Sequence, residues 1–232
     1  MVRLAESLQP ESGAMTLHND IERVLISQTE ILAGIDRVAR EVTETYQGHD
    51  FTVVSVLKGS CVFASDLIRC IPIPLELAFL AASSYGDGTT SGALEINFFP
   101  TGNEIEGRNL LLVDDILDTG KTLFRLKAEL VKRGARDIKT CVFLDKPSRR
   151  EAPLTPDFRC FEVENLFVVG YGLDYAGRYR NLPYVGALRE EVYTSAPKAV
   201  VTTDRPAPLS PRSASAAVPV PNAASKKSSH QG

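Results

Sequence analysis

The feature that most constrains the fold is the alternation of short apolar runs with segments of helical periodicity. The runs with strand character are 51–57, 75–82, 93–99, 109–113, 137–144 and 165–169, and 93–99 alternates as a hairpin strand does. Helical spacing is found in 21–46 (as one helix or two short ones), in 62–70, and in 122–133, which Gly134 closes. Strands that alternate with helices predict an α/β fold with a mostly parallel, twisted sheet and flanking helices.

The two ends of the chain differ in composition from this alternating region. Residues 1–17 are predicted to be a flexible N-terminal segment, and 18–195 are predicted to form the folded domain. Residues 196–232 are rich in Pro, Ala and Ser, and no aromatic residue follows Tyr193. Such a segment cannot bury enough apolar area to offset the entropy of ordering it, so we expect a disordered tail.

Composition and charge argue against several classes of function. A formal net charge of −3 without a basic stripe disfavours a nucleic-acid-binding protein. The histidines and cysteines lack metal-ligand spacing, which disfavours a zinc site. The cysteines are predicted to be small buried thiols in a reducing compartment; they are Cys61, Cys70, Cys141 and Cys160. No apolar stretch approaches the roughly 20 residues of a membrane helix. Because 1–15 also lacks the apolar core of a signal peptide, we expect a cytoplasmic protein.

The residues that follow the strand ending at Val113 carry the strongest chemical signal. In open parallel sheets ligands bind beyond the carboxyl ends of the strands. Here 114–122 reads Asp-Asp-Ile-Leu-Asp-Thr-Gly-Lys-Thr, which places two carboxylates beside small hydroxyl and glycine residues that open a helix. Carboxylates suit hydroxyl groups or Mg²⁺, and the amides of a helix N-terminus suit a phosphate, so the string indicates a sugar-phosphate site.

The string 114–122 is also compatible with two other interpretations. In the plainer one it is a solvated acidic turn in which Asp118 or Thr119 caps the helix. The other is a nucleotide-binding P-loop, suggested by the Gly-Lys-Thr at 120–122. That motif requires a glycine five positions before Gly120, and Asp115 stands there, where its charge would repel a triphosphate. The P-loop interpretation therefore fails.

The string 114–122 resembles the phosphoribosyl pyrophosphate signature of type I phosphoribosyltransferases. Segments 56–60, 145–151 and 167–175 resemble the bacterial hypoxanthine (hypoxanthine-guanine) branch of that family, and the likeness extends from about 17 to 192. The resemblance implies an enzyme of purine salvage that joins hypoxanthine, and guanine as well, to phosphoribosyl pyrophosphate, giving IMP or GMP and pyrophosphate. It also implies a small hood formed by the N- and C-terminal parts of the domain, Mg²⁺ as cofactor, and a homodimer or homotetramer.

For phosphoribosyl pyrophosphate, the resemblance assigns the ribose hydroxyls and Mg²⁺ to Asp114 and Asp115. It assigns the pyrophosphate to Lys58, Gly59 and Arg180, and a second Mg²⁺ to Asp174. In the family the bond before the lysine, here Leu57–Lys58, is often a cis peptide. The residues implied to hold the 5′-phosphate are Asp118, Thr119, Gly120, Lys121 and Thr122.

For the purine, the resemblance assigns Asp118 as general base or hydrogen-bond partner of N7, with a helix cap as its plainer role. Lys146 matches the lysine that donates to O6, which suits a 6-oxo group and not the 6-amino group of adenine. Phe167 would stack on the base, while Val168 and Asp174 would lie at its edge. A mobile lid is implied at Ser84 and Tyr85.

Two alternative functions remain open at the level of sequence. One is a same-fold enzyme that prefers xanthine. The other is a regulatory module that kept the sugar-phosphate pocket while it binds RNA or protein. The intact Lys58, Asp118 and Lys146, together with the acidic charge balance, favour the enzyme.

Overall fold

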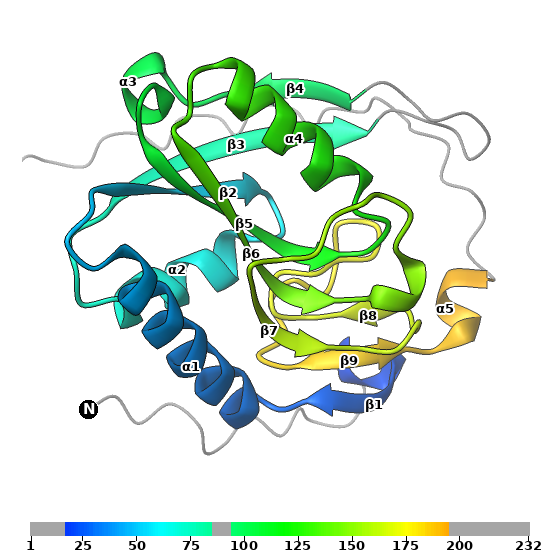
Figure 1. Cartoon of the computed structure of the whole chain (residues 1–232). Coiled ribbons are helices and arrows are strands. Elements are labelled where there is room, and N and C mark those ends of the chain that lie inside the picture. Colours follow the sequence, from blue (N-terminus) through cyan, green and yellow to red (C-terminus); the bar gives the residue numbers. More distant parts are fainter. Residues whose placement is uncertain (1–16, 85–93, 195–232) are drawn as a thin grey trace, which may run out of the picture. The chain divides into compact units, whose positions relative to one another are not determined.

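The computed structural model describes residues 17–84 and 94–194 (Figure 1). The chain divides into two units, 1–196 and 197–232, and all the described residues belong to the first. The main sheet has six strands in the order β4-β3-β2-β5-β6-β7. All neighbouring strands pair in parallel except β3 and β4, which form the predicted hairpin. The bounds are β2 (Phe51–Leu57), β3 (Glu76–Ser84), β4 (Leu94–Phe98), β5 (Asn109–Leu117), β6 (Asp137–Asp145) and β7 (Phe158–Glu162).

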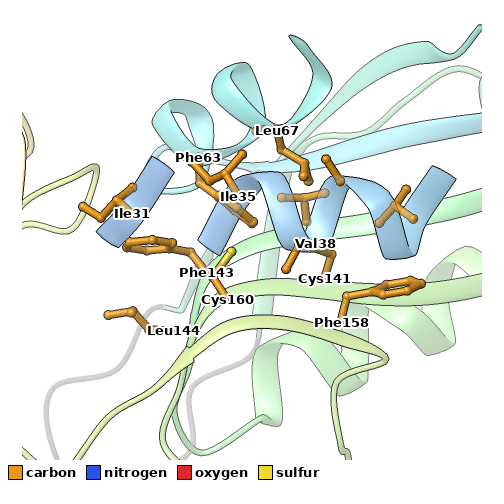
Figure 2. Close-up of a cluster of buried hydrophobic side chains, with 14 of the residues drawn as sticks. Ile31, Ile35, Val38, Phe63, Leu67, Cys141, Phe143, Leu144, Phe158 and Cys160 are labelled. Atoms are coloured by element: carbon orange, nitrogen blue, oxygen red, sulfur yellow. The ribbon is translucent and has the colours of Figure 1, made fainter. Parts of the chain in front are cut away.

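Helices pack on both faces of this sheet, because successive strand residues point to opposite faces. In β2, Val53 belongs to the apolar cluster under α1 (Gln28–Tyr46) and α2 (Cys61–Cys70), and Val54 belongs to the cluster under α4 (Lys121–Lys132). Figure 2 shows the first cluster, in which side chains of both helices meet those of β6 and β7. The predicted mostly parallel sheet with flanking helices is therefore confirmed.

Helix α1 illustrates how local sequence sets an element. Ser27 caps its N-terminus through a capping box: the Ser27 hydroxyl accepts from the Glu30 N–H, and the Glu30 carboxylate accepts from the Ser27 N–H at 2.8 Å. From there the buried residues recur at helical spacing, which lays one apolar face of the helix on the sheet. They are Ile31, Gly34, Ile35, Val38, Ala39, Val42 and Tyr46.

The predicted helix over 21–46 is wrong at its start, because Ile21–Ile26 forms strand β1. This strand pairs antiparallel with β9 (Val185–Leu188), which in turn pairs with β8 (Val168–Val169). The three strands form a second sheet. This sheet combines the N- and C-terminal parts of the domain, which is how the hood was predicted to be built. Three short helical elements complete the domain: η1 (Leu17–Asp20) precedes β1, η2 (Pro147–Arg149) follows β6, and α5 (Glu190–Thr194) follows β9.

Several boundaries also differ from the prediction. Strand β5 continues past Val113 to Leu117, because Asp114 and Ile116 keep the parallel register with β6. The strand expected over 165–169 is reduced to its last two residues, and β7, β9 and the one-turn helix α3 (Gly102–Ile105) were not predicted.

The prediction of buried thiols holds for Cys141 and Cys160, which lie in the core. It is wrong for Cys61 and Cys70, which are exposed at the two ends of α2. No helix within 17–84 and 94–194 combines the length and the apolar character needed to cross a membrane.

Candidate active site

The predicted site segments meet at the carboxyl edge of the sheet, because β2, β5 and β6 are parallel neighbours. Segment 58–60 follows β2, 118–122 follows β5, and Lys146 follows β6. Figure 1 shows the arrowheads of these strands pointing to one side of the sheet. Segments that are up to about ninety positions apart in the sequence are thereby brought together.

A polar cavity of about 230 Å³ lies between the ends of β2 and β5. It gathers most of the residues predicted to bind the sugar phosphate, together with apolar residues from the same strand ends. Its lining is Val56, Leu57, Gly59, Ala82, Asp114, Asp115, Ile116, Leu117, Asp118, Thr119, Gly120, Thr122 and Leu123. The cavity therefore combines carboxylates with the backbone of a loop that opens a helix.

The acid pair lies within β5 and not beyond it, and both side chains are half-buried in the cavity wall. The Asp115 N–H donates to Oδ1 of Asp114 at 3.0 Å. Burial raises the pKa of Asp114 well above its ordinary value, and repulsion from the Asp115 carboxylate raises it further. Burial also raises the pKa of Asp115, although Arg180 opposes the shift. A bound cation or hydroxyl donors would relieve this unfavourable accumulation of charge.

Replacing Asp114 by Asn is expected to stabilise the free protein by about 1 kcal/mol, or about 2–4 °C in Tm. The raised pKa means that the folded state keeps the proton to higher pH than the unfolded chain does. The cost of the charge is therefore absent below the ordinary pKa of 3.8 and grows as the pH rises through the folded value. Thermal unfolding should thus show a larger gain at pH ~8 than at pH ~5. A variant less stable than the parent at the higher pH would contradict this account.

The loop after β5 begins helix α4 at Gly120, whose φ of 80° is left-handed and favours glycine. Gly120 is the N-cap residue and has no side chain to cap the helix. Oγ1 of Thr119 accepts a long hydrogen bond from the Lys121 N–H at 3.5 Å, which agrees in part with the plainer interpretation, whereas the Asp118 side chain does not cap the helix. Instead, Oδ1 of Asp118 accepts a hydrogen bond from Nε of Arg149 at 3.0 Å. Because the first intrahelical bond is that from the Phe124 N–H to the Gly120 carbonyl, the N–H groups of Thr122 and Leu123 have no intrahelical acceptor and can bind an anion.

The Lys58–Gly59 loop packs tightly against the acid pair, and the Leu57–Lys58 bond is cis, as the resemblance implied. A Cβ added to Gly59 would lie 1.6 Å from Oδ2 of Asp115, so only glycine allows this approach. Gly172, with φ of 98°, approaches the same loop from the other side, where an added Cβ would lie 2.2 Å from the Gly59 carbonyl oxygen.

The predicted anion ligand Arg180 is anchored next to this loop. Its Nη1 donates to the Gly172 carbonyl at 2.5 Å, and its Nη2 pairs with Oδ1 of Asp174 at 2.6 Å. The carboxylate of Asp174 also accepts from the Gly177 N–H at 2.8 Å. Arg180 and Asp174 therefore lie together, and their roles toward the pyrophosphate and a second Mg²⁺ stay predictions.

A second cavity, of about 480 Å³, adjoins the first and holds the residues predicted to bind the purine. Nζ of Lys146 donates to the Leu166 carbonyl at 2.7 Å, and burial lowers the pKa of its ammonium group. The ring of Phe167 is 39% exposed, stacks on Tyr193 at 4.9 Å and meets Tyr175 edge-on. The lining is Asp115, Ile116, Asp118, Lys146, Arg149, Asn165, Leu166, Phe167, Val168, Leu173, Asp174 and Tyr193.

Several lining residues were not predicted from the sequence. Ile116 and Leu173 are apolar residues inside recognisable segments, where a position facing the cavity looks like one facing the core. Tyr193 reaches the cavity from α5, and no local pattern indicates this. The lid stays a prediction, because Ser84 ends β3 and Tyr85 lies outside the described residues.

The phosphoribosyl transferase domain family matches residues 26–176, which is more than half of the chain. The chain belongs to this family. The matched range contains every predicted site residue and every cavity-lining residue described above except Arg180 and Tyr193. The two cavities therefore lie at the carboxyl edge of the sheet of a type I phosphoribosyltransferase fold.

Relatives place the chain in the hypoxanthine-guanine branch of the phosphoribosyltransferases. The hypoxanthine-guanine phosphoribosyltransferase of Bacillus subtilis is 45% identical over 179 residues, which cover 77% of this chain and 99% of the relative. The bifunctional protein TilS/HprT of Listeria innocua is 45% identical over 183 residues, but the chain spans only 28% of its length. The hypoxanthine phosphoribosyltransferase structure from Staphylococcus aureus superimposes with a TM-score of 0.74 at 39% identity, covering 79% of this chain and 100% of that one.

Proposed function

We propose that this phosphoribosyltransferase acts in purine salvage and transfers the 5-phosphoribosyl group from phosphoribosyl pyrophosphate to hypoxanthine or guanine. The observation that carries the proposal is the junction of the two cavities. Asp115, Ile116 and Asp118 line both, so a ribose held in one cavity presents C1 to a base held in the other. The products are IMP or GMP and pyrophosphate.

In the reaction a purine nitrogen forms a bond to C1 of the ribose while the bond from C1 to the pyrophosphate oxygen breaks. Asp118, at the junction, takes or shares the proton on N7 of the base as this bond forms. The loop 118–122 holds the 5′-phosphate, and Lys58, Gly59 and Arg180 bind the departing pyrophosphate. Holding both substrates in one geometry supplies a large part of the rate enhancement.

Mg²⁺ is the cation that fits the carboxylates of this site. Asp114 and Asp115 would supply oxygen ligands, and the crowding of two half-buried carboxylates, which raises their pKa values, supports a bound cation there. Asp174 would serve a second ion. Within 17–84 and 94–194 no three carboxylate, Cys or His side chains gather into a ready-made metal site. Mg²⁺ would be held by one or two carboxylates and by substrate oxygens, and it would neutralise the charge of the pyrophosphate.

The choice of base rests on Lys146. Its ammonium group has three donors and no acceptor, so it can donate to the 6-oxo group of hypoxanthine, guanine or xanthine. Against adenine, the N–H groups of Lys146 would meet the N–H groups of the 6-amino group, and two donors cannot form a hydrogen bond. Phe167 is 39% exposed, and the ring face that is not stacked on Tyr193 could stack on any purine, so this contact would supply affinity without choosing among the bases.

The proposal is tested with the purified chain, phosphoribosyl pyrophosphate, Mg²⁺ and each of four bases. Nucleotide should form with hypoxanthine and guanine and far more slowly with adenine. A preference for xanthine would favour the alternative enzyme, and no product with any base would overturn the enzymatic function and favour a regulatory module.

Assembly, location and domain limits complete the proposal. We expect a homodimer or homotetramer, to be measured by light scattering, and a cytoplasmic protein. Residues 18–195 should carry the activity, and residues 196–232 should be dispensable for it.

A further inference from the structure

The last residue of β5 and the first two residues of the loop after it have three consecutive peptide carbonyls, on 117–119, and all three accept hydrogen bonds from the segment 146–152. The Lys146 N–H donates to the Leu117 carbonyl, and two backbone N–H groups, of 151 and 152, donate to the Thr119 carbonyl, each at 3.0 Å. The segment that begins with the purine-binding lysine therefore also holds the backbone of the phosphate loop.

Arg150 is the only side chain among the described residues for which a hydrogen bond to these carbonyls is found. Its Nη1 donates to the Leu117 carbonyl at 2.9 Å and to the Asp118 carbonyl at 2.5 Å. Its Nη2 pairs with the carboxylate of Asp145 at the end of β6. The Arg150 side chain is 16% exposed and that of Asp145 3%, so this guanidinium group is a buried bridge from the sheet to the loop.

The direction of these carbonyls matters for binding an anion. In a trans peptide the C=O and N–H point in opposite directions, so a carbonyl fixed toward Arg150 leaves the next N–H pointing away from it. A carbonyl oxygen turned toward a phosphate would repel it, whereas an N–H group binds it. Gly120 leaves room for the Arg150 side chain, since a Cβ added at Gly120 would lie only 3.1 Å from Cδ of Arg150.

We propose that Arg150 is a positioning residue, which fixes the backbone of 117–119 so that its amides face the 5′-phosphate and the Asp118 side chain faces the base. This rests on the proposed function. Arg150 itself touches neither substrate. It acts through the loop, and its loss should weaken binding of the sugar phosphate more than binding of the purine.

The decisive variant is Arg150→Gln, which removes the charge and the planar fork. The KM for phosphoribosyl pyrophosphate should rise about tenfold or more, as expected when a buried bond from a charged donor is lost. The KM for hypoxanthine should change by less than about threefold. Calorimetry with ribose 5-phosphate should show the same loss of affinity without any reaction. A purely structural defect would instead lower Vmax in proportion to unfolded protein and leave both KM values unchanged.

Arg159→Gln is the matched control, because Arg159 pairs with the same Asp145 carboxylate at 3.2 Å and makes no bond to the carbonyls of 117–119. It should change the KM for phosphoribosyl pyrophosphate by less than about twofold. Equal effects of the two variants, or an unchanged KM in Arg150→Gln, would overturn the proposal.

Arg150→Lys decides by the same criterion if Arg150→Gln does not fold. A single ammonium group keeps the charge but cannot bridge two carbonyls and a carboxylate in the geometry of a guanidinium group. Its KM for the sugar diphosphate should lie above that of the parent, and a value equal to the parent's would overturn the proposal. Absence of activity in the parent chain would count against the proposed function alone, because the calorimetric comparison with ribose 5-phosphate would still test Arg150.

Discussion

Asp118→Ala is expected to lower kcat by about 100- to 10,000-fold, the usual contribution of a positioned general acid or base. Asp118 lies at the junction of the two cavities, where its carboxylate can reach a base that attacks C1. Its backbone, which the phosphate loop uses, is unchanged by the substitution. The KM for phosphoribosyl pyrophosphate should therefore change by less than about threefold. Steady-state kinetics with hypoxanthine measures both quantities.

Asp118→Asn separates proton transfer from shape. The amide keeps a side-chain oxygen that can accept the bond from Nε of Arg149, but it cannot take a proton at neutral pH. It should lose nearly as much turnover as the alanine variant. Near-parental turnover in Asp118→Asn, or equal losses in kcat and in sugar-phosphate affinity in Asp118→Ala, would contradict the assignment of Asp118 as the base.

Much of the central sheet could be predicted because its strands are determined by local sequence. The strand Phe51–Leu57 was predicted with its observed bounds, since a run of apolar and β-branched residues between polar ones is an unambiguous pattern. Helix α4 was predicted within one residue, with Gly134 after it at φ of 87°. In both cases the residues that decide the element lie inside it.

The hood could not be placed by the same means. Ile21–Ile26 carries apolar residues at a spacing that fits a helix, and its strand conformation comes from pairing with β9, about 160 positions away. Strand β9 itself is only four residues long. Short elements stabilised by distant partners leave no local pattern, because their conformation depends on the tertiary contacts and not on the segment alone.

The site residues likewise fall into those that the sequence indicated and those that only the tertiary structure shows. Motif residues such as Asp118 and Lys146 could be found because the segments that contain them resemble those of a known family. Arg150 lies in a recognised segment, but its role depends on carbonyl groups, which every residue has and no sequence displays. Tyr193 reaches the purine cavity from α5 in the same unpredictable way. Sequence thus indicated the residues proposed to carry the chemistry better than those that hold them in place.

The second large effect is expected from Lys146, whose side chain is 7% exposed and which lies in the purine cavity. Lys146→Ala should raise the KM for hypoxanthine about 10- to 100-fold, because a buried bond from a charged donor to O6 contributes about 1.5–3 kcal/mol. The KM for phosphoribosyl pyrophosphate should change little. Lys139→Ala is the control, because Lys139 stands on the same strand but near its amino end, where it pairs with Asp157 at 4.0 Å.

Lys146→Gln tests whether this side chain also sets the choice of base. An amide can rotate to present its oxygen, which would accept a hydrogen bond from the 6-amino group of adenine, whereas lysine only donates. The ratio of kcat/KM for hypoxanthine to that for adenine should therefore fall by at least about tenfold, as measured in competition between the two bases. If the ratio stayed at the parental value while hypoxanthine binding weakened, Lys146 would contribute affinity without specificity. Discrimination against adenine would then have to come from the backbone at Val168, which also lines the cavity.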